Sequence, residues 1–300
     1  LKDLKFSGIN IRFFAPLFST YTFYLGRRLH RKVVVADAKV ALVGGINIAD
    51  KYHGSTTEKP WLDYAVQLNG EIAKPLQQLC RDKYFKKREL KNTKIKSTFQ
   101  IQNDTSVRIL QNDWLKGKNE ICDGYIKSIR QAKKEIIIIG SYFLPGIRII
   151  QALKKASKNK VTIKLILSGK SDLPMTRRAT CFLYDKLLKY NIELYEWDQS
   201  VLHGKVAVID ENWSTIGSFN LNNLSSYGSL EMNVEIRSRS FSSEFRTHLN
   251  GVISQCQSIT KESLKTKTTI MTKFINLFSY VITRMIELVV TYTPYKRFYN

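Results

Sequence analysis

The chain has few acidic residues: its 25 aspartates and glutamates stand against 48 lysines and arginines, which gives a formal net charge of +23 over 300 residues. An excess of this size favours a polyanionic partner, either nucleic acid or an anionic membrane surface, and composition alone does not choose between them. The hydrophobic share of 43% belongs to a globular protein rather than a disordered one. The length allows one large domain or two medium ones with a substantial core.

Cysteine is also scarce. None of the 4 cysteines belongs to a C-x-x-C pair, and none has a histidine nearby at the spacing of metal ligands. We therefore expect reduced, mostly buried thiols in a cytosolic domain, and we expect neither a zinc site nor any other metal or cofactor. The cysteines are Cys80, Cys122, Cys181 and Cys256.

Long apolar runs are missing too: no signal peptide opens the chain, and no run of about 18 apolar residues marks a spanning helix. Residues 270–289 carry an apolar stripe with helical spacing, but charged residues such as Lys273 and Glu287 interrupt it. We therefore do not expect this helix to span a membrane. Basic residues flank it, among them Lys265 and Arg297. Such an amphipathic helix fits either a membrane interface or packing on the domain, and both remain open.

What the sequence does contain is one motif, twice. Residues 30–47 and residues 203–220 both follow the template H-x-K-x4-D-x6-G-[GS]-x-N. Its five fixed residues, at about 5% usage each, would match by chance on the order of once in millions of positions. The duplication predicts two related halves whose motifs meet at one site.

Matching segments precede both motifs. A helix end, an asparagine and an alternating strand occur over residues 186–196, and again over residues 1–14, where Gly8 caps the helix and residues 10–14 form the strand. The second half has further elements upstream, whereas only nine residues precede Asn10 in the first. We therefore expect the chain to lack about the first βαβα portion of its first half.

The expected architecture is α/β, with two pseudo-symmetric halves, each a mixed sheet flanked by helices, and with the first half incomplete. Residues 1–88 form the first half, 89–104 a linker, 105–258 the second half and 259–300 the C-terminal basic amphipathic helix. The expected strands are 61–68, 135–139 and 161–167, and the expected helices are 70–85, 147–157, 175–189 and 270–289.

Each motif opens on a strand, where residues two apart share a face, so its histidine and its lysine point the same way. The motif aspartates, Asp37 and Asp210, complete the catalytic motif, but their odd spacing from the histidines suggests that they stabilise the following turn. The catalytic pairs predicted in this way are His30 with Lys32 and His203 with Lys205.

If the halves pair around a pseudo-two-fold axis, two histidines, two lysines and two asparagines surround one pocket. Ammonium and amide groups suit the oxygens of a phosphodiester, and two imidazoles suit its cleavage by double displacement: one attacks phosphorus and the other protonates the leaving alcohol. Pairing separates the two histidine pKa values, and the lysines neutralise the developing charge without a metal. The predicted substrate-binding residues are Asn47, Asn220 and Ser218.

Two carboxylates lie on strands that follow the motifs. Asp63 and Glu231 are placed to accept a proton from an imidazole and so to fix its tautomer. His53, in a polar loop, and His248, on an expected surface helix, have no such partner, and we interpret both as structural.

The duplicated H-x-K-x4-D motif resembles the signature of the phospholipase D superfamily, and the chain is most similar within it to bacterial cardiolipin synthases. The resemblance covers about residues 1–250 and leaves the helix at 270–289 outside. These synthases usually carry N-terminal membrane spans, and none is present here, which agrees with truncation. The stretches that carry the closer resemblance are 44–48, 61–63, 141–145, 168–172 and 217–221.

The resemblance implies a site between two α/β halves and a covalent phosphatidyl-histidine, resolved by the hydroxyl of a second phosphatidylglycerol to give cardiolipin and glycerol. By analogy His30 is the nucleophile and His203 the general acid, although the symmetry allows the reverse. The phosphate would be held by Lys32, Lys205, Asn47 and Asn220, and the imidazoles would be oriented by Asp63 and Glu231.

The sequence is therefore compatible with three functional hypotheses. The first is phosphatidyl transfer at the bacterial inner membrane, on its cytoplasmic face, with anionic phosphatidylglycerol and the membrane surface as partners. The alternative is a phospholipase D-type hydrolase, or a nuclease or phosphodiesterase of the same superfamily, in which the charge of +23 would serve DNA. Nucleic acid is the less favoured partner. The third is an inactive membrane-binding module, against which the intact histidine, lysine and asparagine of both motifs argue.

Overall fold

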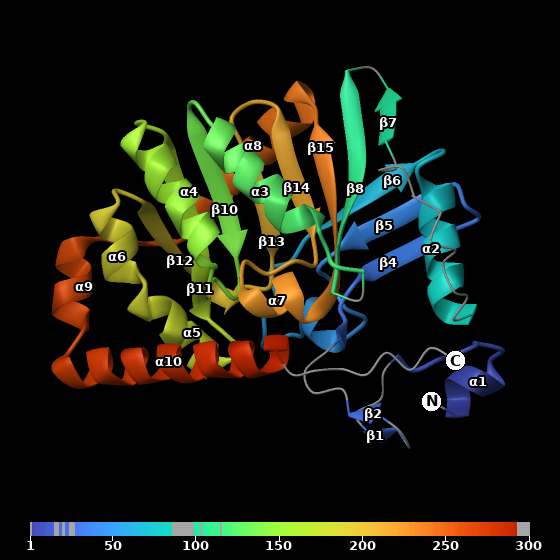
Figure 1. Ribbon diagram of the computed structural model, residues 1–300, viewed down its shortest axis with the longest axis horizontal. Helices are drawn as coiled ribbons and strands as arrows, with labels where there is room; N and C mark the ends of the chain where they lie inside the picture. Colours follow the sequence, from blue (N-terminus) through green and yellow to red (C-terminus); the bar gives the residue numbers. More distant parts are fainter. Residues whose placement is uncertain are drawn as a thin grey trace.

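A large mixed β-sheet carries most of the fold in the computed structural model, which describes residues 2–14, 18–19, 22–23, 28–85, 99–102, 104–114 and 116–292. Its strand order is β16-β12-β11-β10-β13-β14-β15-β8-β7, with β9 added beside β8 and β3 beside β15 (Figure 1). The strands are β3 (Arg28–Leu29), β7 (Phe99–Gln102), β8 (Thr105–Asp113), β9 (Lys118–Asn119), β10 (Glu135–Gly140), β11 (Thr162–Lys170), β12 (Glu193–Val201), β13 (Lys205–Ile209), β14 (Trp213–Gly217), β15 (Ser229–Arg237) and β16 (Gln257–Ile259).

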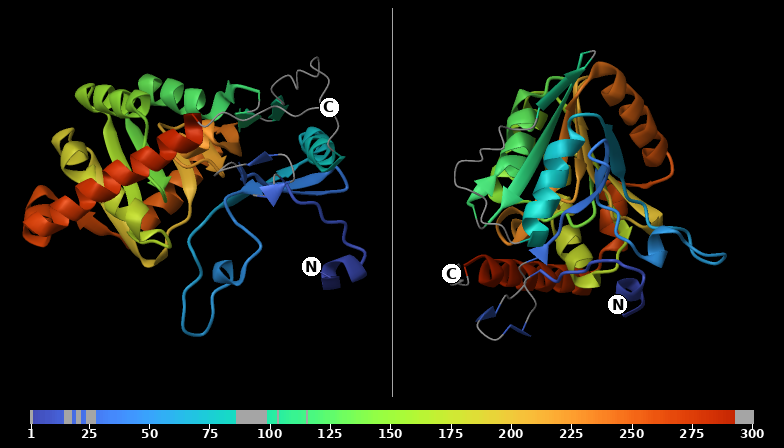
Figure 2. Two further views of the ribbon diagram at one scale, coloured as in Figure 1. Left: turned by 60° about the horizontal axis from the view of Figure 1, so that its bottom comes forward. Right: turned by 90° about the vertical axis from the view of Figure 1, so that its right-hand side faces the viewer.

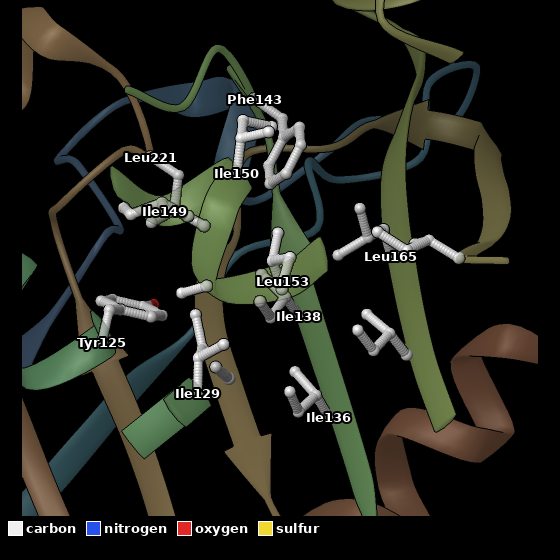
Figure 3. Packing of buried hydrophobic residues seen from close by; sticks show 14 of the residues in the cluster. Tyr125, Ile129, Ile136, Ile138, Phe143, Ile149, Ile150, Leu153, Leu165 and Leu221 are labelled. Atoms are coloured by element: carbon white, nitrogen blue, oxygen red, sulfur yellow. The ribbon is translucent and has the colours of Figure 1, made fainter. Parts of the chain in front are cut away.

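Helices cover both faces of this sheet, because its central strands are apolar on both sides. On β10, Ile136 and Ile138 pack under α3 and α4 (Figure 3), whereas Ile137 and Ile139 belong to the cluster on the opposite face, under α8. Figure 2 shows the sheet between these two layers. The helices of this part are α3 (Glu120–Gln131), α4 (Ile147–Lys158), α5 (Pro174–Phe182), α6 (Tyr184–Lys189), α7 (Asn223–Tyr227), α8 (Arg239–Ile253), α9 (Lys261–Lys267) and α10 (Ile270–Tyr292).

The first motif lies on a separate three-stranded antiparallel sheet, in the order β4-β5-β6. Buried Val43 of this sheet and Leu76 of α2 share one hydrophobic cluster with Val234 of β15 and Ile109 of β8. The small sheet therefore packs directly against the large one, and β15 lies where the two meet (Figure 1). The elements of this part are α1 (Lys2–Phe6), β1 (Phe18–Ser19), β2 (Thr22–Phe23), β4 (Lys32–Ala36), β5 (Val40–Gly44), the 3-10 helix η1 (Asp50–Tyr52), β6 (Ala65–Asn69) and α2 (Ala73–Phe85).

The mixed α/β architecture expected from the sequence is confirmed, as are the elements β10, α4, β11, α2 and α10. The strand predicted at residues 10–14 is wrong: no strand forms there, and Phe13 is 68% exposed, because alternation alone does not supply a neighbouring strand. The helix predicted over 175–189 is divided into α5 and α6 at Leu183.

Two further expectations change in part. The strand predicted over 61–68 begins only at Ala65, as β6, and Leu62 bridges to Leu202 of the second half instead. Most of the predicted linker lies outside the described residues, but its end forms β7, which pairs with β8. The domain boundaries predicted from composition stay predictions. The four cysteines are free thiols, Cys122 buried and the others half-buried.

The last helix, α10, lies along one edge of the molecule, across α5 and α7 (Figure 1). Its segment Ile270–Thr291 is long and apolar enough to cross a membrane by length and composition, with a mean hydropathy of 1.5, and only 28% of that window is buried. This differs from the expectation that interrupting charges exclude it as a spanning candidate, since few of its residues are charged.

Candidate active site

The two motif histidines are tied by their backbones to the opposite halves of the chain. The N–H of His30, just after β3, donates to the carbonyl of Leu230 on β15 at 2.9 Å. The N–H of His203, just before β13, donates to the carbonyl of Leu62 at 2.8 Å. Short parallel pairings, β3 with β15 and Leu62 with Leu202, bring about both contacts. The two motifs therefore meet in a crossed arrangement with approximate two-fold symmetry.

The two predicted carboxylates each contact a histidine, and the partners are exchanged between the halves. Nδ1 of His30 lies 2.9 Å from Oε2 of Glu231, and Nδ1 of His203 lies 2.6 Å from Oδ2 of Asp63. Each carboxylate follows directly after the residue whose carbonyl accepts the histidine N–H. The sequence does not say which imidazole each carboxylate meets, and in the structure each meets the histidine of the other half. Because Nδ1 is occupied, Nε2 of each ring is left for chemistry.

The two motif lysines also share one bonding scheme. The ammonium of Lys32 donates to the carbonyl of His30 at 2.8 Å, and that of Lys205 donates to the carbonyl of His203. Burial lowers the pKa of Lys205 to about 7 and that of Lys32 to about 8. The charges of Asp63 and Glu231 oppose this effect at both lysines. A bound anion would therefore strengthen the protonated form of both groups.

Desolvation by burial lowers the pKa of His203, although its hydrogen bond to Asp63 acts in the opposite direction. The side chain of His203 is 7% exposed, against 25% for His30. Burial therefore favours a neutral His203.

The residue that follows the motif glycine, Gly45 or Ser218, lies against the carboxylate of its own half. The hydroxyl of Ser218 donates to Oε2 of Glu231 at 2.6 Å. At the corresponding Gly45, a Cβ atom would lie 2.3 Å from Oδ1 of Asp63, which leaves no space for a side chain. Ser218 thus contacts an orienting carboxylate.

The two motif asparagines lie at the edge of the site in different surroundings. Asn220 is buried, and its Oδ1 accepts a hydrogen bond from the hydroxyl of Ser141 at 3.0 Å. Asn47 is exposed and donates to the hydroxyl of Tyr52 at 2.9 Å. That hydroxyl lies 3.0 Å from Nδ1 of His203, so Asn47 reaches the histidine of the other half through Tyr52.

The motif aspartates serve turns at the far ends of their strands. Asp37 (φ 52°) and Asp210 (φ 53°) both adopt the left-handed conformation. The carboxylate of Asp210 accepts the backbone N–H groups of Lys133, Lys134 and Glu135 at 2.9, 2.8 and 3.0 Å. The prediction that these residues stabilise turns agrees with this position, and grouping them with the catalytic side chains does not.

Three aromatic side chains that sequence reasoning did not select surround His203. The rings of Tyr52, Trp61 and Tyr142 have centroids 5.8, 5.7 and 5.9 Å from its imidazole. The hydroxyl of Tyr142 donates to Asp172 at 2.6 Å. Tyr52 ends η1, Trp61 follows it in the same connection between β5 and β6, and Tyr142 lies in the loop after β10, so no single spacing rule groups them. Only the resemblance of the stretches 61–63 and 141–145 points to two of the three.

The remaining histidines lie apart from this cluster. His53 follows η1, and His248 on α8 lies 3.3 Å from the hydroxyl of Tyr64. Within the described parts of the chain, no three His, Cys, Asp or Glu side chains are grouped so as to hold a metal ion.

Comparisons with known proteins agree with this geometry. The family model described as "Cardiolipin synthase, PLD-like domain" matches residues 125–253. Cardiolipin synthase B of Escherichia coli (strain K12) is 35% identical over 277 residues, which covers 89% of this chain and 67% of that protein. The minor cardiolipin synthase of Bacillus subtilis (strain 168) is 30% identical, covering 89% of this chain and 67% of that protein.

Among solved structures, phosphatidylserine synthase of Haemophilus influenzae Rd KW20 matches with a TM-score of 0.67 at 14% identity, over 89% of this chain and 72% of that one. At this identity the likeness shows a shared fold and nothing further. The curated relatives and the family model show that the chain belongs to the cardiolipin synthase family of the phospholipase D superfamily.

Proposed function

We propose that the protein is a phosphatidyltransferase that makes cardiolipin from two phosphatidylglycerol molecules and releases glycerol. The observation that carries this proposal is the crossed arrangement of His30 on Glu231 and His203 on Asp63, with a lysine beside each. It leaves the Nε2 atom of each ring free of its carboxylate, and the charges of both lysines act on His203. Membership of the family makes phosphatidyl transfer the reaction that this chemistry serves.

In the first step Nε2 of His30 attacks the phosphorus of one phosphatidylglycerol. The P–O bond to the head-group glycerol breaks, and the Nε2 proton of His203 passes to the leaving oxygen. Burial disfavours the protonated His203 that this step requires. The negative charge of the bound phosphodiester acts in the opposite sense, so substrate binding itself charges the acid.

In the second step the neutral His203 takes the proton from a hydroxyl of a second phosphatidylglycerol. The oxygen attacks phosphorus, the P–N bond to His30 breaks, and cardiolipin is formed. Lys32 and Lys205 would neutralise the phosphate oxygens in both steps, with Asn47, Asn220 and Ser218 at the edge of the site. Glu231 and Asp63 would stabilise the imidazolium that forms on each ring.

The proposed location is the bacterial inner membrane, at its cytoplasmic face, where phosphatidylglycerol is both substrate and anionic surface. The net charge of +23 supports this placement, because anionic lipid attracts basic surfaces.

Product analysis tests the proposal. The full chain, incubated with phosphatidylglycerol in mixed micelles, should yield cardiolipin and glycerol. Phosphatidic acid without cardiolipin would show a hydrolase, and nicked DNA without lipid change would show a nuclease. His53→Ala, which alters a histidine outside the site, is the matched control and should retain the transferase activity.

A further inference from the structure

The helix α10 presents its apolar side to the outside and its polar side to the protein. Ser279, Thr283 and Glu287, four residues apart on one face, are 5, 9 and 5% exposed. A surface helix of a globular protein normally has the opposite orientation. The exposed apolar side chains run along its length: Ile270, Met271, Phe274, Leu277, Phe278, Val281, Met285, Ile286, Leu288 and Val289.

Two contacts from Arg284 to the backbone of a neighbouring loop hold this orientation. The guanidinium of Arg284 donates to the carbonyls of Leu144 and Pro145 at 3.1 and 2.8 Å, and it pairs with Glu287 at 2.8 Å. Turning the apolar face inward would break both backbone contacts and would expose groups that are buried now. The outward apolar face is therefore a consequence of specific bonds.

The loop that Arg284 binds also belongs to the active site. Within it, Ser141 donates to Asn220, and the ring of Tyr142 lies beside His203. The loop follows β10, whose last residue, Gly140, pairs with Lys205. The helix therefore lies along the edge of the molecule where β10 ends and this loop begins (Figure 1).

Neighbouring residues extend the apolar face toward this edge. Leu173 beside α5 and Phe182 at its end are 47 and 39% exposed, and Ile147 at the start of α4 is 73% exposed. Ile147 also lines a cavity together with Tyr280 and Arg284 of α10. The exposed apolar surface is thus continuous with the surroundings of the loop.

The charge around α10 indicates which partner this face takes. Lys261 and Lys265 of α9 and Lys273 of α10 are exposed, and the chain as a whole carries a net charge of +23. A second copy of the chain would bring the same charge and be repelled, whereas an anionic lipid surface is attracted. A helix that crossed the membrane would have to leave Leu144 and Pro145 and carry Arg284 into the bilayer.

We propose that α10 lies flat in the interface of an anionic phospholipid bilayer, with its apolar face in the acyl boundary, so that the catalytic edge faces the lipid head groups. The docking of the protein is argued from the geometry of α10, whereas the benefit of docking for catalysis rests on the proposed function. The docked helix thereby holds the active site next to the lipids of the bilayer, from which the substrate can enter.

Vesicle flotation tests the docking. The variant Phe274→Gln with Phe278→Gln removes two rings that are each 66% exposed, and its binding to vesicles of phosphatidylglycerol and phosphatidylcholine should fall about tenfold or more. The matched control is Val34→Thr with Leu42→Thr, an exposed apolar pair, 58 and 42% exposed, that lies opposite on β4 and β5. The control should bind as the unaltered chain does. Equal binding by all three proteins, with unchanged circular dichroism, would overturn the proposal.

Depth measurements distinguish a flat helix from a spanning one. The single variants are Phe274→Trp, Val281→Trp and Leu288→Trp, all on the same outer face. The fluorescence of each new tryptophan should be quenched best by lipids brominated at one shallow depth. A depth that changes progressively along the helix would instead show a spanning helix. Sedimentation of the chain without lipid tests for a second copy on this face. A dimer for the unaltered chain and a monomer for the double phenylalanine variant would show that a second copy covers it. Either result would overturn the proposal.

An activity comparison separates this proposal from the proposed function. The double phenylalanine variant should lose activity on vesicles about tenfold or more but retain it on soluble short-chain phosphatidylglycerol. Equal loss on both substrates would contradict the docking role. Vesicle binding without activity on either substrate, seen for the unaltered chain, would contradict the proposed function and leave the docking intact.

Discussion

The two copies of the motif have one bonding scheme in two environments. In each, the histidine Nδ1 meets a carboxylate of the other half and the lysine contacts the carbonyl of its own histidine. The copy that begins at His203 lies in the large sheet, where Lys205 and Asn220 are 2 and 6% exposed. The copy that begins at His30 lies on the small sheet, and its Asn47 is exposed. The histidine and the lysine thus have equivalent partners in both copies, while the surrounding sheet determines burial and hence charge.

The largest predicted effect separates the roles of the two histidines. His30→Ala and His203→Ala should each lower the rate of cardiolipin formation about 1,000-fold or more. With phosphatidyl nitrophenol, whose leaving group needs no proton, His203→Ala should still release one burst of nitrophenolate per site and then stall. The covalent adduct then persists because no base activates the second hydroxyl. His30→Ala should give no burst.

Stopped-flow absorbance measures this burst, and mass spectrometry locates the adduct on His30. His53→Ala, outside the site, should behave as the unaltered chain. A burst from His30→Ala but not from His203→Ala would exchange the two roles. No burst from any protein would exclude the double displacement.

A second test compares the two lysines, of which Lys205 is the more deeply buried. Lys205→Met should lower kcat/KM about 100-fold, because the lysine charge that neutralises the phosphate oxygens is lost. It should also stabilise the fold by roughly 1–4 kcal/mol near neutral pH, because a buried charge is replaced by an apolar group. Lys32→Met should lower kcat/KM similarly but stabilise less, since burial lowers its pKa only to about 8.

The stability effect has a defined pH dependence. The pKa of Lys205 is lowered from 10.5 to about 7 in the folded chain, so between these values the unfolded chain binds the additional proton. Wild-type stability therefore rises with pH across this window. The advantage of Lys205→Met should be complete below about pH 7 and vanish near pH 10.5. Urea unfolding at about pH 6 and about pH 9 measures it, and an advantage that grows with pH would contradict this account.

Sequence patterns predict the members of this site better than their partners. The duplicated spacing selects the histidines, lysines and asparagines, because strand alternation and turn residues are local properties. The exchange of Asp63 and Glu231 between the halves depends on how two sheets dock, which no local pattern encodes. For the same reason no local pattern predicts Tyr52, which reaches His203 from η1 of the other half.

The same distinction holds for the fold. The apolar run of β10 and the helical stripe of α10 predict these elements because both signals are local, whereas the strand expected at 10–14 is wrong because it has no pairing partner. The apolar stripe of α10 was visible in the sequence, but its outward orientation was not. That orientation follows from the contact of Arg284 with Pro145, a pairing of residues far apart in the chain.

A third test uses the same substitution at corresponding positions of the two motifs. Gly45→Ala places a Cβ atom 2.3 Å from Oδ1 of Asp63 and should displace that carboxylate from His203, lowering kcat about 10–100-fold. Ser218→Ala removes the hydroxyl that donates to Glu231 and accepts the N–H of Met232, but Glu231 keeps its contact with His30, so kcat should fall about tenfold or less. Steady-state kinetics with thermal melts would compare them. An equal loss in both variants would mean that crowding at Gly45 is not what sets the position of Asp63.

The smallest predicted effect concerns the asparagines, where burial should decide stability. Asn220→Ala leaves the buried hydroxyl of Ser141 without its acceptor and should lower the free energy of unfolding by about 1–2 kcal/mol. Asn47→Ala removes an exposed contact with Tyr52 and should change it by less than about 0.5 kcal/mol. Both should raise KM for phosphatidylglycerol if both amides hold the phosphate. Parallel urea unfolding and kinetics would separate these outcomes, because a stability loss without a KM change at Asn220 would leave that residue a purely structural role.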